Sequence, residues 1–261
     1  MAANIHYVTS GLAPAAGTPA LLLIHPLGSS HVFWEECAAI WSKRFHVVAI
    51  DLRGAGASPV PDHNWKVEEH VRDIISVRED AGLRDVVVIG CAIGSMIAAP
   101  YAAADAAVVR GLVLSNTTME LGEASRARHD GRLALIREKG MAALLPTVID
   151  MAFDGLPKDD RYARYVERFR HNNPQGYGAL ALGMVGTNNT EILKNLDVPT
   201  LVTVGAHDIL LPPDMSHRVH ALVKGSEFAL VERGAHFLPY QAPKEFAALV
   251  DAFVARAVQK E

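Results

Sequence analysis

The sequence predicts an α/β protein whose mostly parallel sheet is covered by helices on both faces. Short apolar runs, each suited to one buried strand, alternate along the chain with longer stretches of helical periodicity. Several of these runs end in loops rich in glycine or polar residues. In a parallel sheet, such loops meet beyond the carboxyl ends of the strands, where ligands bind.

The predicted elements divide the chain into three parts. Strands are expected at residues 5–9, 21–24, 45–50, 86–89, 111–115, 199–204 and 228–231, and the main helices at 31–41, 67–81, 95–104, 213–223 and 243–256. Between residues 117 and 195 we expect no buried strand, only helices with many charges. We therefore predict a core in two parts, residues 1–116 and 196–261, separated by a helical lid, residues 117–195.

The stretch from Asp85 to Tyr101, D-V-V-V-I-G-C-A-I-G-S-M-I-A-A-P-Y, is the most informative in the chain. A buried strand, a Gly-x-x-x-Gly turn and a helix of small residues form the pattern of a nucleophile elbow. Glycine flanks such a turn because a Cβ there would collide with the adjacent strand or helix. The apex of the turn carries Ser in an enzyme of this type, whereas this chain has Ala92.

Polar residues with catalytic potential follow the ends of other predicted strands. Asp208 and His236 come after the two last strands, and His25 and Asp51 after two early ones. The parallel architecture would bring all of them to the same edge as Ala92. A histidine can act there as a general base, and an aspartate can orient it and stabilise its charged form.

The chain contains, in order, the motifs H-P-L-G-S-S, D-L-R-G-A-G-A-S, G-C-A-I-G, G-A-H-D and G-A-H-F. Through these motifs, the whole chain resembles the α/β-hydrolase superfamily. The resemblance implies an α/β-hydrolase fold with a mostly parallel sheet of the eight-stranded type. It also implies Ala92 at the nucleophile position, Asp208 as the acid and His236 as the base. The backbone N–H groups of Leu27 and Ile93 would then form the oxyanion hole.

The lid resembles that of 3-oxoadipate enol-lactonases and related hydrolases of ring-cleavage products. The segments that carry this likeness are S-N-T-T-M-E-L-G, R-L-A-L-I-R-E-K-G-M-A-A-L and N-N-P-Q-G-Y-G-A. The resemblance implies a small substrate that bears a carboxylate, in bacterial catabolism of aromatic compounds. Basic lid residues could bind that carboxylate, and Arg132 is the predicted contact because arginine suits a bidentate grip.

Ala92 allows three interpretations. The first is an engineered Ser→Ala change, which we favour because the surrounding elbow is intact. The second is a natural relative that does not hydrolyse its ligand. The third is that Cys91 has taken over as the nucleophile. A natural alanine would mean loss of hydrolysis or a cofactor-free reaction driven by the histidine base alone. Cys91 lies one residue from the apex, so we expect it to line the substrate pocket instead.

Composition narrows the class of protein. The chain has 261 residues and a formal net charge of −4, with no basic run of the kind that binds nucleic acid. Two cysteines and no basic leader at the start favour a cytoplasmic protein. No apolar run approaches the ~20 residues that span a bilayer. We expect no cofactor, no metal and no membrane or nucleic-acid partner, with a small molecule as ligand, and a homo-oligomer is compatible with the sequence.

Three functions remain open at this point. The first is a serine-type hydrolase of a small carboxylated ester or enol-lactone, inactivated at its nucleophile. The second is a carbon–carbon bond hydrolase that uses the same triad on ring-cleavage diketones. The third is a binding protein that uses the pocket without turnover, and it predicts no activity even after Ser is restored at position 92.

Overall fold

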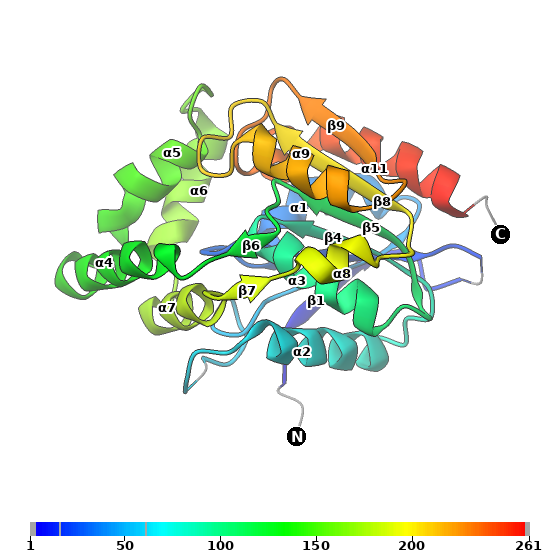
Figure 1. Cartoon of the computed structure of the whole chain (residues 1–261), viewed down its shortest axis with the longest axis horizontal. Helices are drawn as coiled ribbons and strands as arrows, with labels where there is room; N and C mark the ends of the chain where they lie inside the picture. Colours follow the sequence, from blue (N-terminus) through cyan, green and yellow to red (C-terminus); the bar gives the residue numbers. More distant parts are fainter. Residues whose placement is uncertain (1–3, 16, 61, 259–261) are drawn as a thin grey trace.

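The computed structural model describes residues 4–15, 17–60 and 62–258, and its centre is a seven-stranded sheet (Figure 1). The strand order is β1-β3-β2-β4-β5-β8-β9, and all neighbouring strands are parallel except the pair β1 and β3. The strands are β1 (Tyr7–Gly11), β2 (Ala20–Ile24), β3 (His46–Ile50), β4 (Val86–Cys91), β5 (Val109–Ser115), β8 (Thr200–Gly205) and β9 (Glu227–Val231).

This arrangement confirms the predicted mostly parallel sheet and corrects its size. The resemblance implied a sheet of the eight-stranded type, whereas the described residues contribute seven strands to it. The difference lies at the antiparallel edge, because the described chain supplies a single strand ahead of β2. The parallel strands that carry the predicted site residues are all present.

Alternate side chains of the strands enter two separate hydrophobic cores. On β2, Leu21 and Leu23 pack into one core, and Leu22 and Ile24 into the other, as the two-residue period of a strand requires. The first core is covered by α1 (Glu35–Trp41) and α11 (Pro243–Val258). The second is covered by α2 (Val67–Asp80), α3 (Ile93–Ala104), α8 (Thr190–Lys194) and α9 (Pro213–Leu222).

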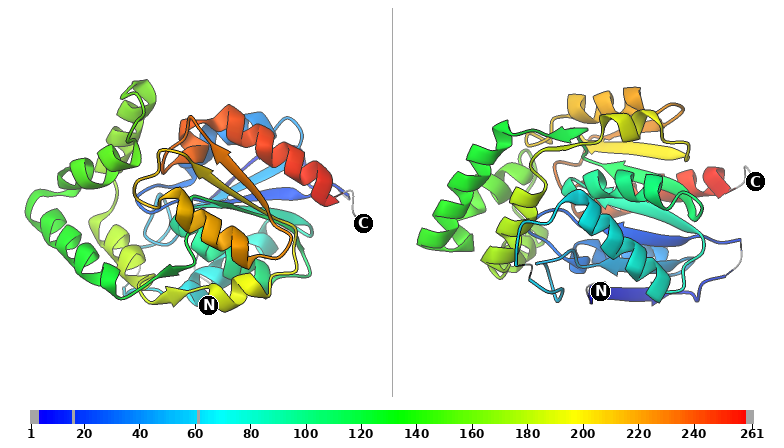
Figure 2. Two further views of the ribbon diagram at one scale, coloured as in Figure 1. Left: turned by 45° about the horizontal axis from the view of Figure 1, so that its top comes forward. Right: turned by 60° about the horizontal axis from the view of Figure 1, so that its bottom comes forward.

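The lid stands beside the carboxyl edge of the sheet and consists mainly of helices (Figures 1 and 2). Its elements are α4 (Ala124–Lys139), a 3-10 turn (Met141–Leu144), a π-helical turn (Leu145–Ile149), α5 (Asp150–Ala152), α6 (Asp160–Arg170) and α7 (Pro174–Gly183). A two-stranded ribbon, β6 (Glu120–Leu121) with β7 (Thr187–Asn188), pairs the segments that enter and leave it.

The expected lid, residues 117–195, therefore differs from the structure in two ways. It was expected to contain only helices, but the β6–β7 ribbon closes its base. Helix α8 falls within the same range, yet it packs against α3 and α9, and its Leu193 belongs to the second core. Two-residue strands and a five-residue helix are too short to give a periodic signal, so only the tertiary structure places them.

The two glycines of the elbow allow β4, α3 and β2 to approach closely. A Cβ at Gly94 would collide with the carbonyl oxygen of Ile24 on β2, and one at Gly90 with the backbone of Gly94. Glycine is therefore required at both positions for the predicted reason, which is that a Cβ would collide with the adjacent strand or helix. The start of α3 is thereby pressed against the end of β2, next to the residues that follow that strand.

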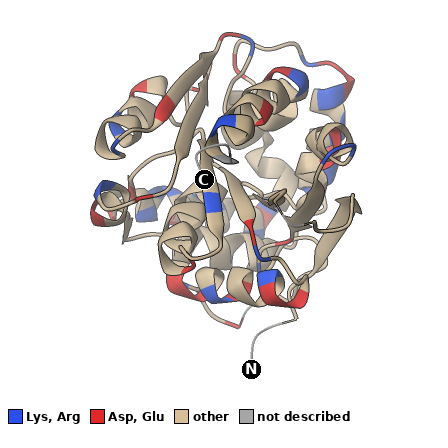
Figure 3. Cartoon of the chain, turned by 90° about the vertical axis from the view of Figure 1, so that its right-hand side faces the viewer, with Lys and Arg blue, Asp and Glu red and all other residues tan. Residues whose placement is uncertain are grey.

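Acidic and basic residues are interspersed along the helices in the view of Figure 3. Among the described residues, no helix combines the length and the apolar character needed to cross a bilayer. Helices α2, α3 and α9, which cover the sheet, each carry buried polar residues. One of these residues, His70 on α2, has a consequence for stability.

His70 is fully buried, and neither of its ring nitrogens has a hydrogen-bond partner among the described residues. Burial, together with the nearby charge of Arg53, lowers its pKa to about 4. The unfolded chain binds this proton near the ordinary pKa of about 6.5, so the free energy of unfolding falls as the pH drops from about 6.5 toward 4.

We predict that His70→Leu makes stability less sensitive to acid. Leucine keeps an apolar side chain in the core and removes the group whose protonation opposes folding. Urea unfolding at pH 7 and pH 5 measures the effect, and the variant should lose less stability between these pH values than the unmodified chain. Equal losses in both proteins would contradict this assignment.

Candidate active site

A cavity of about 620 Å³ lies between the carboxyl edge of the sheet and the lid. From the core it is lined by Pro26, Leu27, Ala92, Ile93, Met96, Ile209, Leu210, Leu211, His236 and Phe237. From the lid it is lined by Thr118, Leu121, Arg128, His129, Gly131, Arg132, Leu135, Thr147, Val148, Met151 and Tyr177. The lid thus provides one wall of the cavity, and the strand ends provide the other.

Ala92 occupies the apex of the turn between β4 and α3, with φ 50° and ψ −116°. A positive φ is uncommon for alanine and costs on the order of 1–3 kcal/mol. Ala92 is 5% exposed, lines the cavity and directly precedes the first residue of α3. The backbone therefore has the strained geometry of an elbow, although the side chain at its apex is a methyl group.

His236 and Asp208 are brought together at the same edge of the sheet. Nδ1 of His236 lies 3.0 Å from Oδ2 and 3.1 Å from Oδ1 of Asp208. Because the carboxylate accepts from Nδ1–H, the lone pair of the neutral imidazole lies on Nε2. No described residue hydrogen-bonds to Nε2, and His236 lines the cavity. The arrangement is that of a general base held in one tautomer.

Asp208 is buried and accepts hydrogen bonds from several donors besides His236. The backbone N–H groups of Leu210 and Leu211 donate to Oδ1 at 2.9 and 2.8 Å, and Asn116 Nδ2 donates to Oδ2 at 2.8 Å. Burial by itself raises the pKa of Asp208, but the charge and hydrogen bond of His236, with these donors, outweigh it and hold the pKa below its ordinary value. The carboxylate therefore stays ionised opposite the imidazole.

Asn116 is a site residue that the sequence analysis missed. It follows β5 with φ 51°, and its amide donates to Ala235 O at 2.9 Å as well as to Asp208. Ser115 Oγ in turn donates to Asn116 Oδ1 at 2.9 Å. Its position directly after a buried strand was a usable signal, because the strands before Asp208 and His236 end at the same edge.

Leu27 and Ile93, the predicted oxyanion-hole residues, both line the cavity. Ile93 is the first residue of α3, so its N–H has no partner within the helix. In the part of the chain that the structure describes, no hydrogen bond satisfies the N–H of either residue. Two free N–H donors beside Ala92 can together stabilise a developing oxyanion.

His25 fixes the direction of one of these donors. Its Nε2 accepts a hydrogen bond from Leu52 N at 2.9 Å, and its Nδ1–H donates to Pro26 O at 2.8 Å. Pro26 O and Leu27 N–H belong to one planar trans peptide, so they point in opposite directions. By holding the carbonyl, His25 turns the N–H of Leu27 away from itself. Burial lowers the pKa of His25, which keeps it in this neutral form.

Cys91 was expected to line the substrate pocket, and the structure places it elsewhere. It is the last residue of β4, fully buried in the first core, and its thiol lies 3.8 Å from His236 O. Successive strand residues point to opposite faces, so a residue next to the apex turns away from the cavity. Burial raises the pKa of the Cys91 thiol well above its ordinary value, with Asp208 adding to the effect, which disfavours the nucleophilic thiolate.

The lid wall of the cavity carries several polar residues, among them the predicted Arg132, its neighbour Arg128, His129 and Tyr177. Arg132 donates to Thr147 O at 3.3 Å from within α4. His129 is 5% exposed and Tyr177 is 4% exposed, and within the described part of the chain neither the ring nitrogens of His129 nor the hydroxyl of Tyr177 has a hydrogen-bond partner. Burial, with the charges of Arg132 and Arg128, lowers the pKa of His129 to about 4. Near neutral pH, the two arginines therefore carry the positive charge, and His129 and Tyr177 offer neutral hydrogen bonds.

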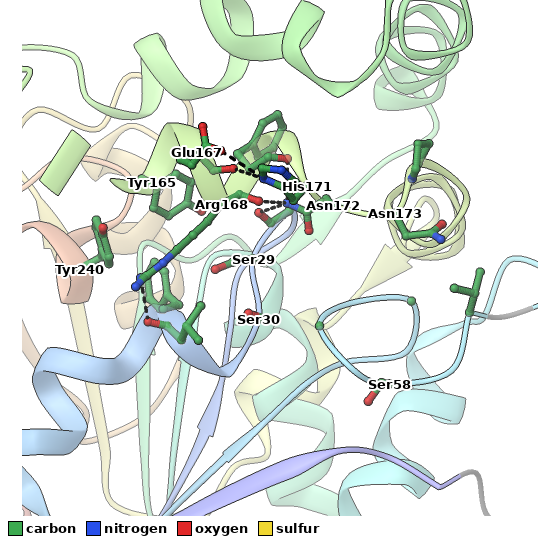
Figure 4. Close-up of a pocket in the computed structure, with 18 residues that line it drawn as sticks. Ser29, Ser30, Ser58, Tyr165, Glu167, Arg168, His171, Asn172, Asn173 and Tyr240 are labelled. Carbon is green, nitrogen blue, oxygen red and sulfur yellow. Dashed lines mark hydrogen bonds and ion pairs between the residues drawn. The ribbon is translucent and has the colours of Figure 1, made fainter. Parts of the chain in front are cut away.

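A second cavity, of about 640 Å³, lies on another part of the lid–core junction and shares no lining residue with the first (Figure 4). Its polar residues include Ser29, Ser30, Arg168, His171 and Asn172. It contains none of the predicted catalytic residues. Arg168 is held by Glu35 in an ion pair at 2.8 Å.

One group of described residues has the spacing of a metal site. His6, His31 and Asp51 place potential ligand atoms within 4.8 Å of one another. The Asp51 carboxylate accepts hydrogen bonds from both imidazoles, at 2.8 and 2.9 Å, and from the N–H groups of His31 and Ala57. These hydrogen bonds account for the burial of Asp51, so the group fits a structural role at the end of β3.

Comparisons with known proteins identify the family of the chain. A family model described as the alpha/beta hydrolase fold matches residues 19–243. The chain belongs to the α/β-hydrolase fold family. This confirms the resemblance inferred from the sequence motifs, and the mostly parallel sheet with its flanking helices is the fold of that family.

Similar proteins include hydrolases of more than one kind. The chain is 23% identical to 3-oxoadipate enol-lactonase 2 of Acinetobacter baylyi, with 97% of this chain and 93% of that protein aligned. Among solved structures, the enol-lactonase of Burkholderia xenovorans LB400 has a TM-score of 0.90 at 22% identity, covering 98% of this chain and 99% of the other. A thermophilic esterase of Thermogutta terrifontis has a TM-score of 0.87 at 22% identity, covering 97% and 93%.

We predict that Asn116→Asp destabilises the protein in a pH-dependent way. The change keeps the size of the side chain and tolerates the positive φ, but it replaces a donor to Asp208 with a second carboxylate. At pH 7 the loss in urea unfolding should be on the order of 2 kcal/mol or more. It should shrink by pH 5, because repulsion raises the pKa of one carboxyl and the folded state then takes up a proton.

Asn116→Gly is the matched control, since it removes the same hydrogen bonds without adding a charge. Its loss should be nearly the same at both pH values. If the two variants showed the same pH dependence, the amide would not be acting on the Asp208 carboxylate.

Proposed function

We propose that the cavity is the substrate site of a hydrolase for small carboxylated esters or enol-lactones. The observation that carries this proposal is the His236–Asp208 pair facing the same cavity as the strained apex at Ala92. The basic lid wall supports a substrate with a negative charge. The similarity to proteins named enol-lactonases supports the lactone class.

The proposed reaction requires a hydroxyl at position 92. With Ser there, Nε2 of His236 would take the hydroxyl proton as the oxygen attacks the carbonyl carbon. The oxyanion would receive hydrogen bonds from the N–H groups of Leu27 and Ile93. His236 would then protonate the leaving oxygen, and water would cleave the acyl-enzyme by the reverse sequence. Apart from water, this reaction needs no co-reactant.

With Ala92, this covalent route is closed, because a methyl group cannot attack a carbonyl. Cys91 does not replace it, since its buried thiol lies outside the cavity. An engineered Ser→Ala change and a natural alanine both fit this geometry. Under either interpretation, the chain keeps the base, the two N–H donors and the binding wall of such a hydrolase.

We predict that Ala92→Ser produces ester or lactone hydrolysis. The measurement is turnover of aryl esters and of carboxylated γ-enol-lactones by both proteins. Since loss of the serine from a comparable triad lowers kcat by about 10⁶-fold, a gain on the order of 10⁴-fold or more is expected. The gain should disappear when His236→Ala is added to Ala92→Ser.

Two results would redirect the assignment. If Ala92→Ser cleaved ring-cleavage diketones but neither esters nor lactones, the site would belong to a carbon–carbon bond hydrolase. If it cleaved none of them while the chain bound small carboxylates tightly, the pocket would serve binding without turnover. A lack of gain with every ester and lactone refutes the proposed hydrolase.

We predict that Arg132→Gln in the Ala92→Ser background weakens binding of carboxylated substrates. Loss of one charged hydrogen bond of about 1.5–3 kcal/mol corresponds to a roughly 10- to 100-fold rise in KM. The same change should have little effect on a neutral ester of equal size. Steady-state kinetics on the paired substrates separates the two effects.

Arg126→Gln is the matched control, because Arg126 lies on the same helix, pairs with Glu123 and does not line the cavity. It should leave KM for both substrates within about 2-fold of the parent value, as expected for a surface substitution. If Arg132→Gln raised KM for the neutral ester as much as for the carboxylated substrate, Arg132 would be shaping the lid and not binding the carboxylate.

A further inference from the structure

The described residues that line the cavity include the imidazole of His236 but no nucleophilic side chain at the apex of the elbow. Among its described lining residues, Thr118, Thr147 and Tyr177 are those with hydroxyl groups, and all three belong to the lid wall, not to the elbow. Ser95, which follows the elbow, is fully buried, donates its hydroxyl proton to Ala92 O and lies within hydrogen-bond distance of the Thr117 hydroxyl. None of these groups stands in for the missing serine beside His236.

The base at this site has an unoccupied lone pair. In a serine enzyme, the hydroxyl of the nucleophile hydrogen-bonds to Nε2 of the histidine. Here position 92 offers a methyl group, and no described residue occupies Nε2. Asp208 is held ionised on the opposite side of the ring, where its negative charge can stabilise the imidazolium that forms when Nε2 accepts a proton. The base can therefore accept a proton directly from a bound molecule.

The groups that would hold an oxyanion remain in place beside this base. The N–H of Ile93 is free at the start of α3, and the N–H of Leu27 is directed by the His25–Pro26 contact. The strained φ of Ala92 is retained, and it sets the orientation of the peptide that carries the Ile93 N–H. A base next to an oxyanion hole is the requirement for removing a proton from the carbon next to a carbonyl.

We propose that this chain, with Ala92 as it stands, catalyses enolisation of a small carbonyl compound. Nε2 of His236 takes a proton from the carbon next to the carbonyl, and the C–H electron pair forms a carbon–carbon double bond. The carbonyl π electrons move to oxygen, which the N–H groups of Leu27 and Ile93 stabilise. The imidazolium then returns the proton to the same carbon or to the far end of a conjugated system. The result is isotope exchange or a double-bond shift, with no oxidant or co-reactant.

The walls of the cavity restrict the substrate to a carbonyl compound with an anionic end. Arg128 and Arg132 lie on the lid wall, opposite Ala92 and His236. His129, neutral near pH 7, and Tyr177 add unpaired hydrogen-bonding groups beside them. Apolar residues such as Leu135, Val148 and Leu210 line the same cavity. A short keto acid or a carboxylated unsaturated lactone matches this distribution of charge.

This inference shares the cavity with the proposed hydrolase but does not depend on its chemistry. The first probe is therefore levulinate, a keto acid that contains no ester bond and cannot be hydrolysed. Deuterium incorporation next to its ketone is followed by proton NMR in D₂O with the unmodified chain. Catalysis by a positioned base should raise the rate roughly 100-fold or more above the buffer rate. His236→Gln, which removes the base, should return it to the buffer rate.

Two further variants test whether the exchange depends on the free Nε2 of His236 and not on general changes in the fold. Arg126→Gln, on the lid but outside the cavity, adds no group near His236 and should keep the exchange rate within about 2-fold. Ala92→Ser adds a hydroxyl that competes for Nε2, so exchange should slow several-fold while hydrolysis is gained. Butanone, which has the same ketone without the carboxylate, should exchange much more slowly at equal concentration. Thermal unfolding of each variant shows whether it is folded.

The outcomes distinguish this inference from the proposed function. A second probe, a carboxymethyl γ-enol-lactone, reports the double-bond shift by its ultraviolet absorbance. The enolisation proposal would be refuted if the unmodified chain exchanged levulinate protons and shifted the lactone double bond no faster than folded His236→Gln. That conclusion would hold whatever Ala92→Ser hydrolyses. Exchange that persisted in His236→Gln would equally refute it. Exchange without any hydrolysis by Ala92→Ser would refute the hydrolase and leave enolisation standing.

Discussion

The site depends on the close packing of three backbone segments at the elbow. Gly94 lies so near the end of β2 that no side chain fits between them, and Gly90 lies equally close to the start of α3. The turn that joins β4 to α3 is short because of this contact, and Ala92 takes up the resulting strain. The positions of the apex, of the Ile93 N–H and of the loop after β2 therefore follow from one steric constraint.

A second constraint is the burial of two carboxylates at the same edge of the sheet. Asp51 and Asp208 are both removed from solvent, and each is stabilised by imidazole and by backbone N–H donors. An unpaired buried carboxylate would be costly, so these donors are a condition of the fold. The two groups differ in what lies beyond them. The histidines of Asp51 stabilise a loop, whereas the histidine of Asp208 faces a cavity.

The sequence predicted those features that depend on local patterns. Buried apolar runs identified the strands, and glycine spacing identified the elbow, because both follow from backbone geometry within a few residues. Asn116 escaped notice because its role lies in contacts with Asp208 and Ala235, far along the chain. Cys91 was placed in the pocket wrongly, since the alternation of side chains along β4 turns it into the core. The hydroxyl of Tyr177, which has no hydrogen-bond partner among the described residues, could be placed in the cavity only from the tertiary structure.

The difference between a hydrolase site and a proton-transfer site here is one oxygen atom. Ser and Ala have the same backbone and Cβ, so the strain at position 92, the N–H donors and the His236–Asp208 pair are the same for either residue. What changes is the partner of Nε2, which is a hydroxyl in one case and the bound molecule in the other. Covalent catalysis also requires an attackable carbonyl carbon, whereas enolisation requires an acidic C–H beside that carbonyl. Because esters, lactones and ketones can offer both, we expect the residue at the apex, more than the shape of the cavity, to decide between the two proposed reactions.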